Sequence, residues 1–96
     1  MTALPPLDPL LHSQLRLAIM SLLMSEETAD FKYLKEKTGA TAGNLSVQLN
    51  KLKEAGYLEV EKTFKDNYPH TEATITETGK DAFETYVNQL QQYLKP

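Results

Sequence analysis

Residues 30–62 contain the feature that most constrains the fold: two short helical patterns followed by an alternating strand pattern. Gly39 separates the two helical patterns, and Gly56 follows the second. Because glycine takes up positive φ angles freely, each glycine is a natural end for a helix. Two helices joined by a tight turn form a motif whose second helix can enter a DNA major groove. The segment therefore predicts a helix-turn-helix, and nucleic-acid recognition rather than catalysis.

Caps and apolar spacing set the limits of these helices. Asp30 and Thr41 precede the two helical patterns, and each side chain can accept a hydrogen bond from a free amide of the first turn. The second pattern has an inward stripe with the spacing i, i+4 and i+7. Its residues are Leu45, Leu49 and Leu52. We therefore expect a helix at about residues 42–55 with one buried face.

A strand pattern begins directly after Gly56. Apolar and polar residues alternate there with the period of a half-buried strand. The sequence KDNYPHT, residues 65–71, is rich in turn-forming residues, and residues 72–75 can return as the partner strand with Ala73 and Ile75 inward. The predicted fold class is a winged helix-turn-helix, which is mostly α with a small β-hairpin wing at about residues 65–71.

The flanking segments show more apolar surface than one small core needs. Residues 9–24 have helical spacing with two apolar stripes, and Thr76 can cap a last helix at about residues 77–94. The last helix has a seam of Phe83, Val87, Leu90 and Leu94, flanked by Tyr86 and Tyr93. The surplus predicts a homodimer, with an interface that includes Leu10, Leu17, Met20, Val87, Leu90 and Leu94. The alternative for the first helix is that an N-terminal arm folds back over its second stripe.

Length and composition describe one soluble domain over residues 1–96. Such a chain can form a single modest core, here at about residues 10–76, to which the last helix is added. Cysteine is absent, which excludes disulfides and thiolate metal sites and fits a cytoplasmic protein. The first residues lack the basic start of a signal peptide, and no apolar run is long enough to cross a bilayer.

Charge is unevenly distributed along the chain. The net charge of −3 argues against indiscriminate binding to nucleic acid. Residues 32–65, however, carry seven lysines against four glutamates, a local charge of +3, whereas the rest of the chain carries −6. The positive part of the chain is thus the part that contains most of the helix-turn-helix, although the excess is small.

The outward face of the helix at 42–55 is the strongest candidate for a binding site. Asn and Gln can bond adenine through both amide atoms, Ser and Thr can bond bases or phosphates, and Val can meet a thymine methyl. Gly43 in the first turn lowers stability by roughly 1 kcal/mol relative to alanine, which close approach to a phosphate would explain. The candidates are Thr41, Gly43, Asn44, Ser46, Val47, Gln48 and Lys51 on the helix, and Lys62, Lys65 and His70 on the wing. The alternative is a solvated helix face and a solvated hairpin tip.

No pattern indicates catalysis, a metal or a cofactor. His12 and His70 lie on different predicted elements, with no nearby carboxylate or second histidine at ligand spacing. The sequence has no nucleophile beside a base and no glycine loop for phosphate. We therefore expect neither an enzyme nor a metal site.

Residues 31–62 follow the pattern FxxLKxxxGxTxGNLSxxLxxLxxAGYxxVxK, and Arg16, Thr76 and Gly79 agree on the flanks. On these residues the chain resembles winged-helix transcriptional regulators of the MarR and ArsR type, and more closely the small stand-alone winged-helix domains. The resemblance covers about residues 12–93. It implies dimeric regulators that bind pseudo-palindromic DNA. The sequence departs from the pattern at Val47 and Gln48, where such proteins often have Arg and His.

The function predicted from residues and resemblance together is that of a homodimeric, cytoplasmic transcriptional regulator that binds double-stranded DNA. The helix at 42–55 is expected to occupy the major groove, and the wing to hold the sugar–phosphate backbone. The alternative is a winged helix that serves as a protein-interaction or dimerisation module without strong DNA binding, which the acidic balance suits.

Overall fold

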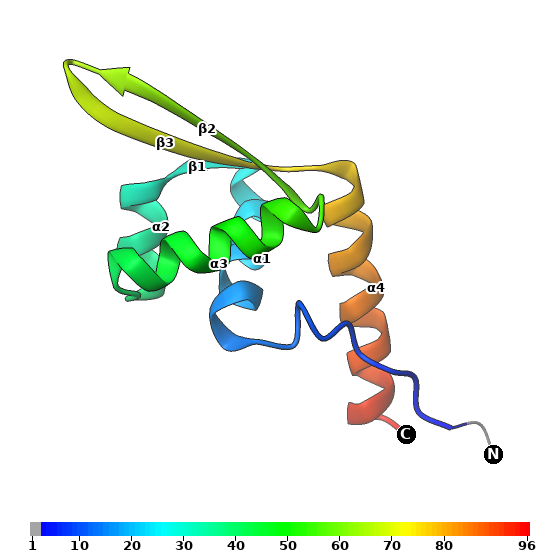
Figure 1. The fold of residues 1–96 in the computed structure, drawn as a ribbon. Coiled ribbons are helices and arrows are strands. Elements are labelled where there is room, and N and C mark those ends of the chain that lie inside the picture. Colours follow the sequence, from blue (N-terminus) through cyan, green and yellow to red (C-terminus); the bar gives the residue numbers. More distant parts are fainter. Residues whose placement is uncertain (1–2) are drawn as a thin grey trace.

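The computed structural model describes residues 3–96, in which three helices and a small sheet pack together and a long last helix runs away from the sheet (Figure 1). The elements are α1 (Gln14–Glu26), β1 (Thr28–Asp30), α2 (Phe31–Thr38), α3 (Ala42–Glu54), β2 (Leu58–Lys65), β3 (Tyr68–Ile75) and α4 (Glu77–Leu94). The three strands are antiparallel in the order β1-β3-β2. This architecture confirms the predicted winged helix-turn-helix.

The helix-turn-helix has the caps that its sequence predicts. Asp30 accepts a hydrogen bond from the backbone N–H of Tyr33 at 2.7 Å, and the Thr41 hydroxyl accepts one from the N–H of Asn44 at 3.2 Å. Gly39 ends α2 with a φ of +72°. The three leucines of the inward stripe of α3 are buried in the core. Local sequence therefore determines where α3 begins and which of its faces is buried.

The core lies where α1, α2 and α3 meet the sheet. Its fully buried side chains are Leu11, Ile19, Met20, Leu23, Leu34, Leu45 and Leu52. Met20 has no exposed surface, so its expected place in a dimer interface is wrong. Met20, which belongs to the expected second apolar stripe of α1, is instead part of the chain's own core.

The helix α1 begins at Gln14 and not near Pro9 as the spacing predicted. Asp8 folds the preceding residues into a turn, because its carboxylate accepts from the N–H of Leu10 and its carbonyl accepts from the N–H of His12, both at 2.9 Å. Ser13 has extended backbone angles and separates this turn from α1. Leu10 and Leu11 therefore pack on the core from an N-terminal arm, residues 3–13, and not from a helix.

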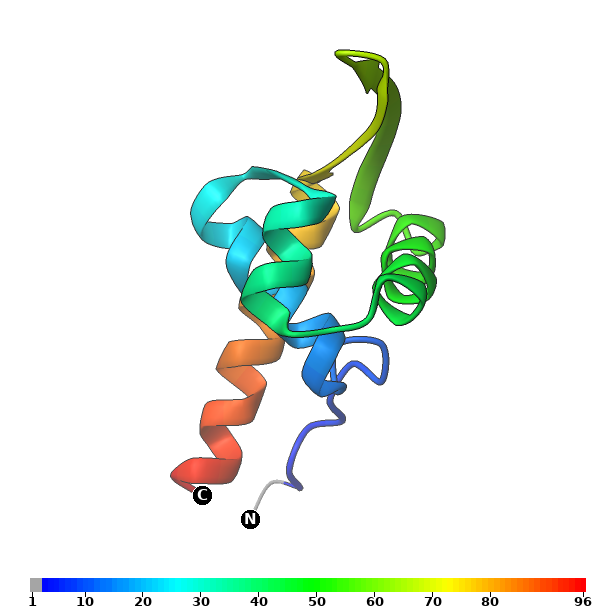
Figure 2. The same ribbon diagram turned by 90° about the vertical axis from the view of Figure 1, so that its left-hand side faces the viewer.

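Tyrosine hydroxyls hold the N-terminal arm against the rest of the chain. The Tyr57 hydroxyl donates to Asp8 at 2.5 Å, and His12 Nδ1 lies 2.9 Å from the Tyr86 hydroxyl. Near the end of α4, the hydroxyl of Tyr93 donates to the carbonyl of Pro5. The arm and the C-terminal end of α4 consequently lie side by side, as Figures 1 and 2 both show.

The wing is longer and its turn is tighter than expected. The strands β2 and β3 pair without interruption up to Lys65 and Tyr68, so the turn consists of Asp66 and Asn67 alone. Both turn residues have positive φ, +52° and +65°, as in the two-residue hairpin turns that match the twist of a β-ribbon. The expected seven-residue wing loop is therefore wrong, because residues 68–71 belong to β3.

Close backbone contact anchors the start of α4. The Thr76 hydroxyl accepts from the N–H of Gly79 at 3.0 Å and donates to the carbonyl of Gly56 at 2.6 Å. A Cβ at Gly79 would lie only 2.3 Å from the carbonyl oxygen of Tyr57. Glycine is therefore required there to bring α4 against the junction between α3 and β2.

Candidate nucleic-acid interface

The helix α3 presents a polar face to solvent over most of its length. Its buried leucines leave the expected binding residues on the outside, where all except Gln48 are exposed. The exposed residues are Thr41, Gly43, Asn44, Ser46, Val47 and Lys51. Gln48 is half-buried. The structure therefore brings the predicted residues of α3 together on one accessible surface.

Gly43 is not required by packing within the chain. A Cβ added at this position would have no neighbouring atom within 4 Å, in contrast to Gly79. The first turn of α3 is therefore open on the side of Gly43. This openness leaves room for a phosphate to approach the free amides at the start of the helix.

Arg16 contacts the polar face of α3 from α1, although it was not among the residues predicted for the site. Its Nη1 donates to Gln48 Oε1 at 2.5 Å, and its Nε donates to the carbonyl of Leu10 at 2.5 Å. Gln48 Nε2 in turn donates to Asn44 Oδ1 at 3.0 Å. Arg16 is the single arginine of the sequence and agrees with the family pattern, and these were the signals that could have drawn attention to it.

The register of the wing separates the three predicted wing residues. Side chains alternate between the two faces of a strand, so Lys62 and Thr71 share the face toward α3, together with buried Leu58 and Ala73. Lys65 lies on the opposite face, at the last strand position before the turn. Only Lys62 of the three therefore faces α3.

His70 lies on the outer face of the wing beside a carboxylate. Its Nε2 is 3.7 Å from Glu72 Oε2, so the expectation that no carboxylate lies near this histidine is wrong. Glu61 and Glu72 are also direct cross-strand partners, and Glu59 lies on the same face. The outer face of the wing is therefore acidic, whereas its inner face carries Lys62.

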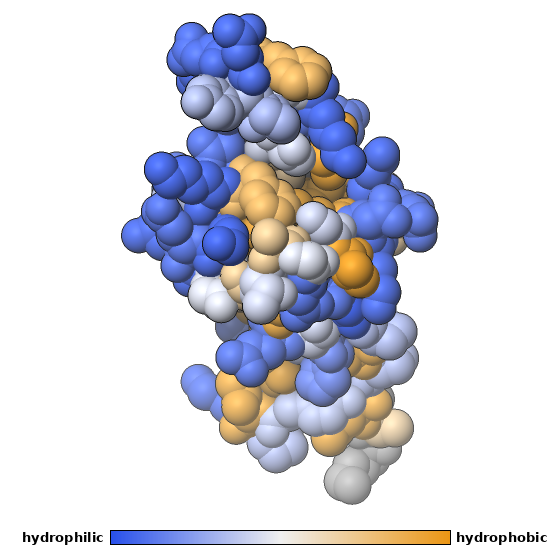
Figure 3. All heavy atoms as spheres, turned by 60° about the vertical axis from the view of Figure 1, so that its left-hand side comes forward, coloured by the Kyte–Doolittle hydropathy of each residue, from blue (hydrophilic) through white to orange (hydrophobic). Residues whose placement is uncertain are grey.

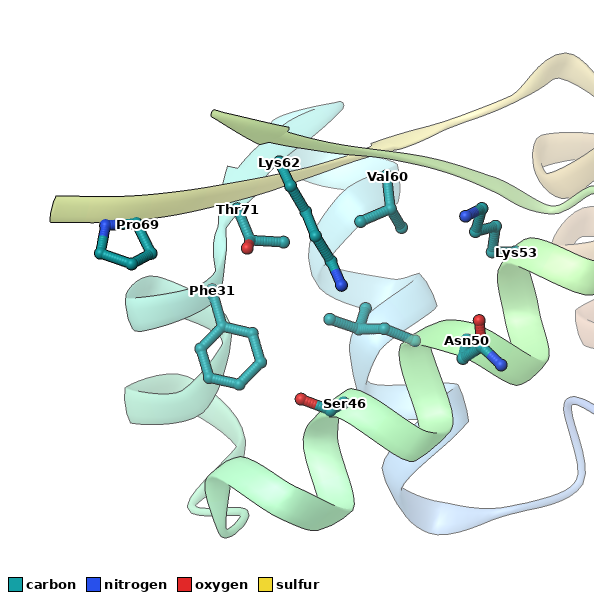
Figure 4. Close-up of a pocket in the computed structure, with 9 residues that line it drawn as sticks. Phe31, Ser46, Asn50, Lys53, Val60, Lys62, Pro69 and Thr71 are labelled. Atoms are coloured by element: carbon teal, nitrogen blue, oxygen red, sulfur yellow. The ribbon is translucent and has the colours of Figure 1, made fainter. Parts of the chain in front are cut away.

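A groove of about 320 Å³ lies between α3 and the inner face of the wing. Apolar and polar side chains both line it: Phe31, Ser46, Leu49, Asn50, Lys53, Val60, Lys62, Pro69 and Thr71. Figure 4 shows Lys62 pointing from β2 toward α3, with Phe31 on one side of the groove and Asn50 and Ser46 on α3. No ion pair in residues 3–96 involves Lys53 or Lys62, so both ammonium groups can meet an external anion.

The last helix exposes a surface of the opposite kind. Only Gly79 and Tyr86 of α4 are buried, so Tyr86 belongs to the core and does not merely flank the seam. Phe83, Val87 and Leu90 are half-buried, and Leu94 is 73% exposed. Figure 3 shows apolar surface both beneath the wing and at the end of the molecule where the two termini lie.

One tyrosine in this region has a strongly shifted pKa. Burial, followed by the hydrogen bond to Asp8 and the negative charge of Asp8, raises the pKa of Tyr57 to about 12. The neutral hydroxyl therefore persists as the donor that ties the N-terminal arm to Tyr57, in the connection between α3 and β2.

No group of three or more His, Cys, Asp or Glu residues in the described part of the chain is placed to hold a metal ion. None of the helices in residues 3–96 is long and apolar enough to cross a membrane.

Comparison with known proteins agrees with this geometry. Residues 15–94 match the model of a family described as the winged helix DNA-binding domain. The chain belongs to this family. An uncharacterised protein of Methanocaldococcus jannaschii, MJ0432, is 38% identical to this winged helix domain over 84 residues, which are 88% of this chain and 91% of that protein.

Solved structures of transcriptional regulators share the fold of this winged helix domain. A transcriptional regulator homologue from Pyrococcus horikoshii OT3 has a TM-score of 0.83 and 26% identity, covering 90% of this chain and 85% of that one. A MarR-family regulator from Silicibacter pomeroyi has a TM-score of 0.68 and 16% identity, covering 86% of this chain and 55% of that one. The chain thus shares the winged-helix fold of these regulators, the MarR-family protein among them.

Proposed function

We propose that this winged helix domain is a homodimeric transcriptional regulator that binds a pseudo-palindromic operator in double-stranded DNA. The observation that carries the proposal is the orientation of α3, which buries its leucines and exposes its amide and hydroxyl side chains. Side chains of these kinds bond base edges and phosphates in the major groove. The recognition helix is α3, with Asn44, Gln48 and Lys51 closest to the DNA in the proposed complex.

The groove between α3 and the wing provides the backbone contact. When α3 enters a major groove, the sugar–phosphate strand beside it faces the inner surface of the wing. Lys53 and Lys62 flank this groove and have no ion-pair partner among residues 3–96. They are the residues that would neutralise phosphates, with Lys65 reaching the strand from the wing tip. His70 is a weaker candidate, since Glu72 lies beside it.

The seam of α4 supports the homodimer. An apolar surface of this kind is covered most simply by an identical seam in a two-fold dimer, where each residue meets its own counterpart or a neighbour. Val87, Leu90 and Leu94 are its members, and Leu10 and Leu17 are half-buried candidates on the arm and α1. A two-fold dimer places its two recognition helices at half-sites one helical turn, or a multiple of it, apart.

Fluorescence anisotropy with a duplex selected from a random DNA pool tests this function. Replacing Gln48 with alanine is expected to lower affinity for the selected site by about 1–3 kcal/mol and to relax selectivity at one base pair in each half-site. Lys95→Ala, which removes one positive charge at the far end of the chain, is the control and should bind as the wild type does. Equal binding of all duplexes by all three proteins would contradict a recognition role for α3.

A second candidate function is a protein-interaction module built on the same fold. The observation that favours it is the acidic outer face of the wing, where Glu59, Glu61 and Glu72 lie together. This face would repel phosphates and attract a basic protein surface. A chain that dimerises but never shifts a DNA duplex, even at low salt, would support this second candidate.

A further inference from the structure

We propose that Arg16 determines which base the recognition helix selects, by fixing the amides of Gln48 and Asn44 so that they present hydrogen-bond donors to the DNA. The proposal rests on the proposed function, since it concerns the same helix in the same groove. Asn44, which is exposed, is the residue that contacts the base, and Arg16 and Gln48 are positioning residues. The base selected is guanine.

The first step is the contact between Arg16 and Gln48. A guanidinium group has five N–H donors and no acceptor, so the amide atom that faces Arg16 Nη1 must be the oxygen. The distance of 2.5 Å between Nη1 and Gln48 Oε1 makes this a close, charge-assisted hydrogen bond. The second bond of Arg16, from Nε to the carbonyl of Leu10, holds the guanidinium group in place.

The second step transmits this choice to Asn44. With its oxygen toward Arg16, Gln48 directs Nε2 toward Asn44, one helical turn earlier, at 3.0 Å. An amide nitrogen only donates, so the atom of Asn44 that faces it must be Oδ1. The Nδ2 of Asn44, with its two N–H groups, is therefore on the side of its amide away from Gln48. The hydrogen bond from Arg16 thus sets the orientation of the Gln48 amide, and the bond from Gln48 sets the orientation of the Asn44 amide.

The third step is the match to a base edge. In the major groove guanine offers two neighbouring acceptors, N7 and O6, whereas adenine offers N7 beside an N6 donor. A free Asn or Gln pairs with adenine because its oxygen accepts from N6 while its nitrogen donates to N7. Here the bond from Gln48 turns the Asn44 oxygen toward Gln48 and the Asn44 nitrogen toward the other side, so the N6 amino group would face another donor. The fixed amide pair therefore favours guanine over the adenine expected from amide side chains alone.

Two substitutions separate this mechanism from a general loss of affinity. Gln48→Glu keeps an acceptor for Arg16, but a carboxylate also accepts from Asn44, so Asn44 should turn its nitrogen toward residue 48 and its oxygen toward the DNA. The preferred base should change from guanine to one that offers an amino donor, adenine or cytosine. Arg16→Met keeps an apolar stem and removes every donor, so both amides can rotate and the preference should fall.

The test is selection of bound duplexes from a random DNA pool with the wild type, Gln48→Glu and Arg16→Met, each checked for folding by circular dichroism. The wild type should prefer guanine over adenine on the order of 10-fold at one position of each half-site. Gln48→Glu should reverse that preference, and Arg16→Met should reduce it to about 2-fold or less. Added negative charge on its own would weaken binding to all sequences and leave the preferred base unchanged.

The outcomes distinguish the inference from the function on which it rests. A wild type that enriches no sequence overturns both. A wild type that enriches a site, combined with unchanged base preference in both variants, overturns the inference alone and leaves the DNA-binding function in place. If Arg16→Met does not fold, Gln48→Glu decides the question, because it retains both hydrogen bonds of Arg16.

Discussion

The helices α3 and α4 are both surface helices, yet they expose opposite chemistry. Three leucines of α3 are buried, and its exposed face consists of small polar side chains and lysines. Only Gly79 and Tyr86 of α4 are fully buried, and its apolar seam is partly covered by the core at Phe83 and Leu90 and exposed at Leu94. A polar face can remain hydrated until a ligand arrives, whereas an exposed apolar seam is stabilised by a partner that covers it. This difference is the reason for proposing DNA as the ligand of α3 and a second copy of the chain as the partner of α4.

The two helices are also held to the body in different ways. The helix α3 is fixed at its start by its Thr41 cap and in its middle by Arg16 through Gln48. The helix α4 is fixed at its start by Thr76 and Gly79, and farther along by Tyr86 and Tyr93 to the N-terminal arm. The proposed DNA-binding surface is therefore held by contacts to the core, and the proposed dimer surface by contacts to the arm.

The largest effect is expected from placing a charge in the seam of α4. Leu94→Glu should dissociate the dimer and lower operator affinity by about 10²-fold or more, because the two half-sites would no longer be bound together. Leu94 is 73% exposed, so the monomer should keep its fold. Gln92→Glu adds the same charge on the opposite side of α4 and is the control. Unchanged sedimentation of Leu94→Glu would remove α4 from the interface.

A pair of glycine substitutions compares the starts of the two helices. Gly79→Ala should lower the free energy of unfolding by about 1–3 kcal/mol, because its Cβ would meet the carbonyl oxygen of Tyr57. Gly43→Ala should raise it by up to about 1 kcal/mol, since alanine favours a helix and the site is open. Urea unfolding followed by circular dichroism measures both. If Gly43→Ala nevertheless weakens DNA binding, the close approach of a phosphate to this turn is supported; equal binding would argue against it.

The wing lysines are expected to have a smaller and sequence-independent effect. Lys62→Ala should weaken binding to all duplexes alike and reduce the log–log salt slope by about one, because one phosphate contact is lost. Lys65→Ala should act in the same way. Anisotropy titrations at several salt concentrations measure the slope, with Lys95→Ala as the matched control. A salt slope equal to that of the wild type in both variants would mean that the wing does not contact the backbone.

The smallest effect concerns pH and the N-terminal arm. The pKa of Tyr57 is raised from its ordinary value of 10.0 to about 12, so the folded state keeps this proton where the unfolded chain loses it. The stability that the hydroxyl contributes is therefore complete below pH 10 and is lost as the pH rises toward about 12. Tyr57→Phe should show a shallower alkaline loss of stability in urea unfolding. An identical alkaline profile in both proteins would contradict the assigned shift.

Local signals in the sequence predicted the parts of the fold that local interactions determine. The caps at Asp30, Thr41 and Thr76 and the turn at Gly39 depend on neighbours within a few residues, and the structure has all four. The start of α1 was misplaced because apolar spacing continues through Leu10 and Leu11, although Asp8 folds them into a turn. The spacing alone could not show that these leucines reach the core from an arm.

The parts that sequence could not supply depend on contacts between distant residues. Met20 was placed in the dimer interface because two apolar stripes exceed one face, but it is fully buried within the single chain. Lys62 lies on one face of the wing, and Lys65 and His70 lie on the other, because of the register between β2 and β3. The two-residue turn sets this register, whereas the expected seven-residue loop left it undetermined. Arg16 reaches Gln48 across 32 residues of sequence, a separation with no periodic signal.

The measurement that tests the separate roles of α3 and α4 most directly is sedimentation velocity of the chain alone and with a fluorescent duplex that contains a selected site. The account predicts a free species of twice the 10.8 kDa chain mass and a complex with two chains on each duplex. Gln48→Ala should keep the dimer and form less complex at a given concentration, whereas Leu94→Glu should sediment as the 10.8 kDa monomer and form the least complex. A 10.8 kDa species that leaves the duplex unbound at every concentration in low salt would contradict the account.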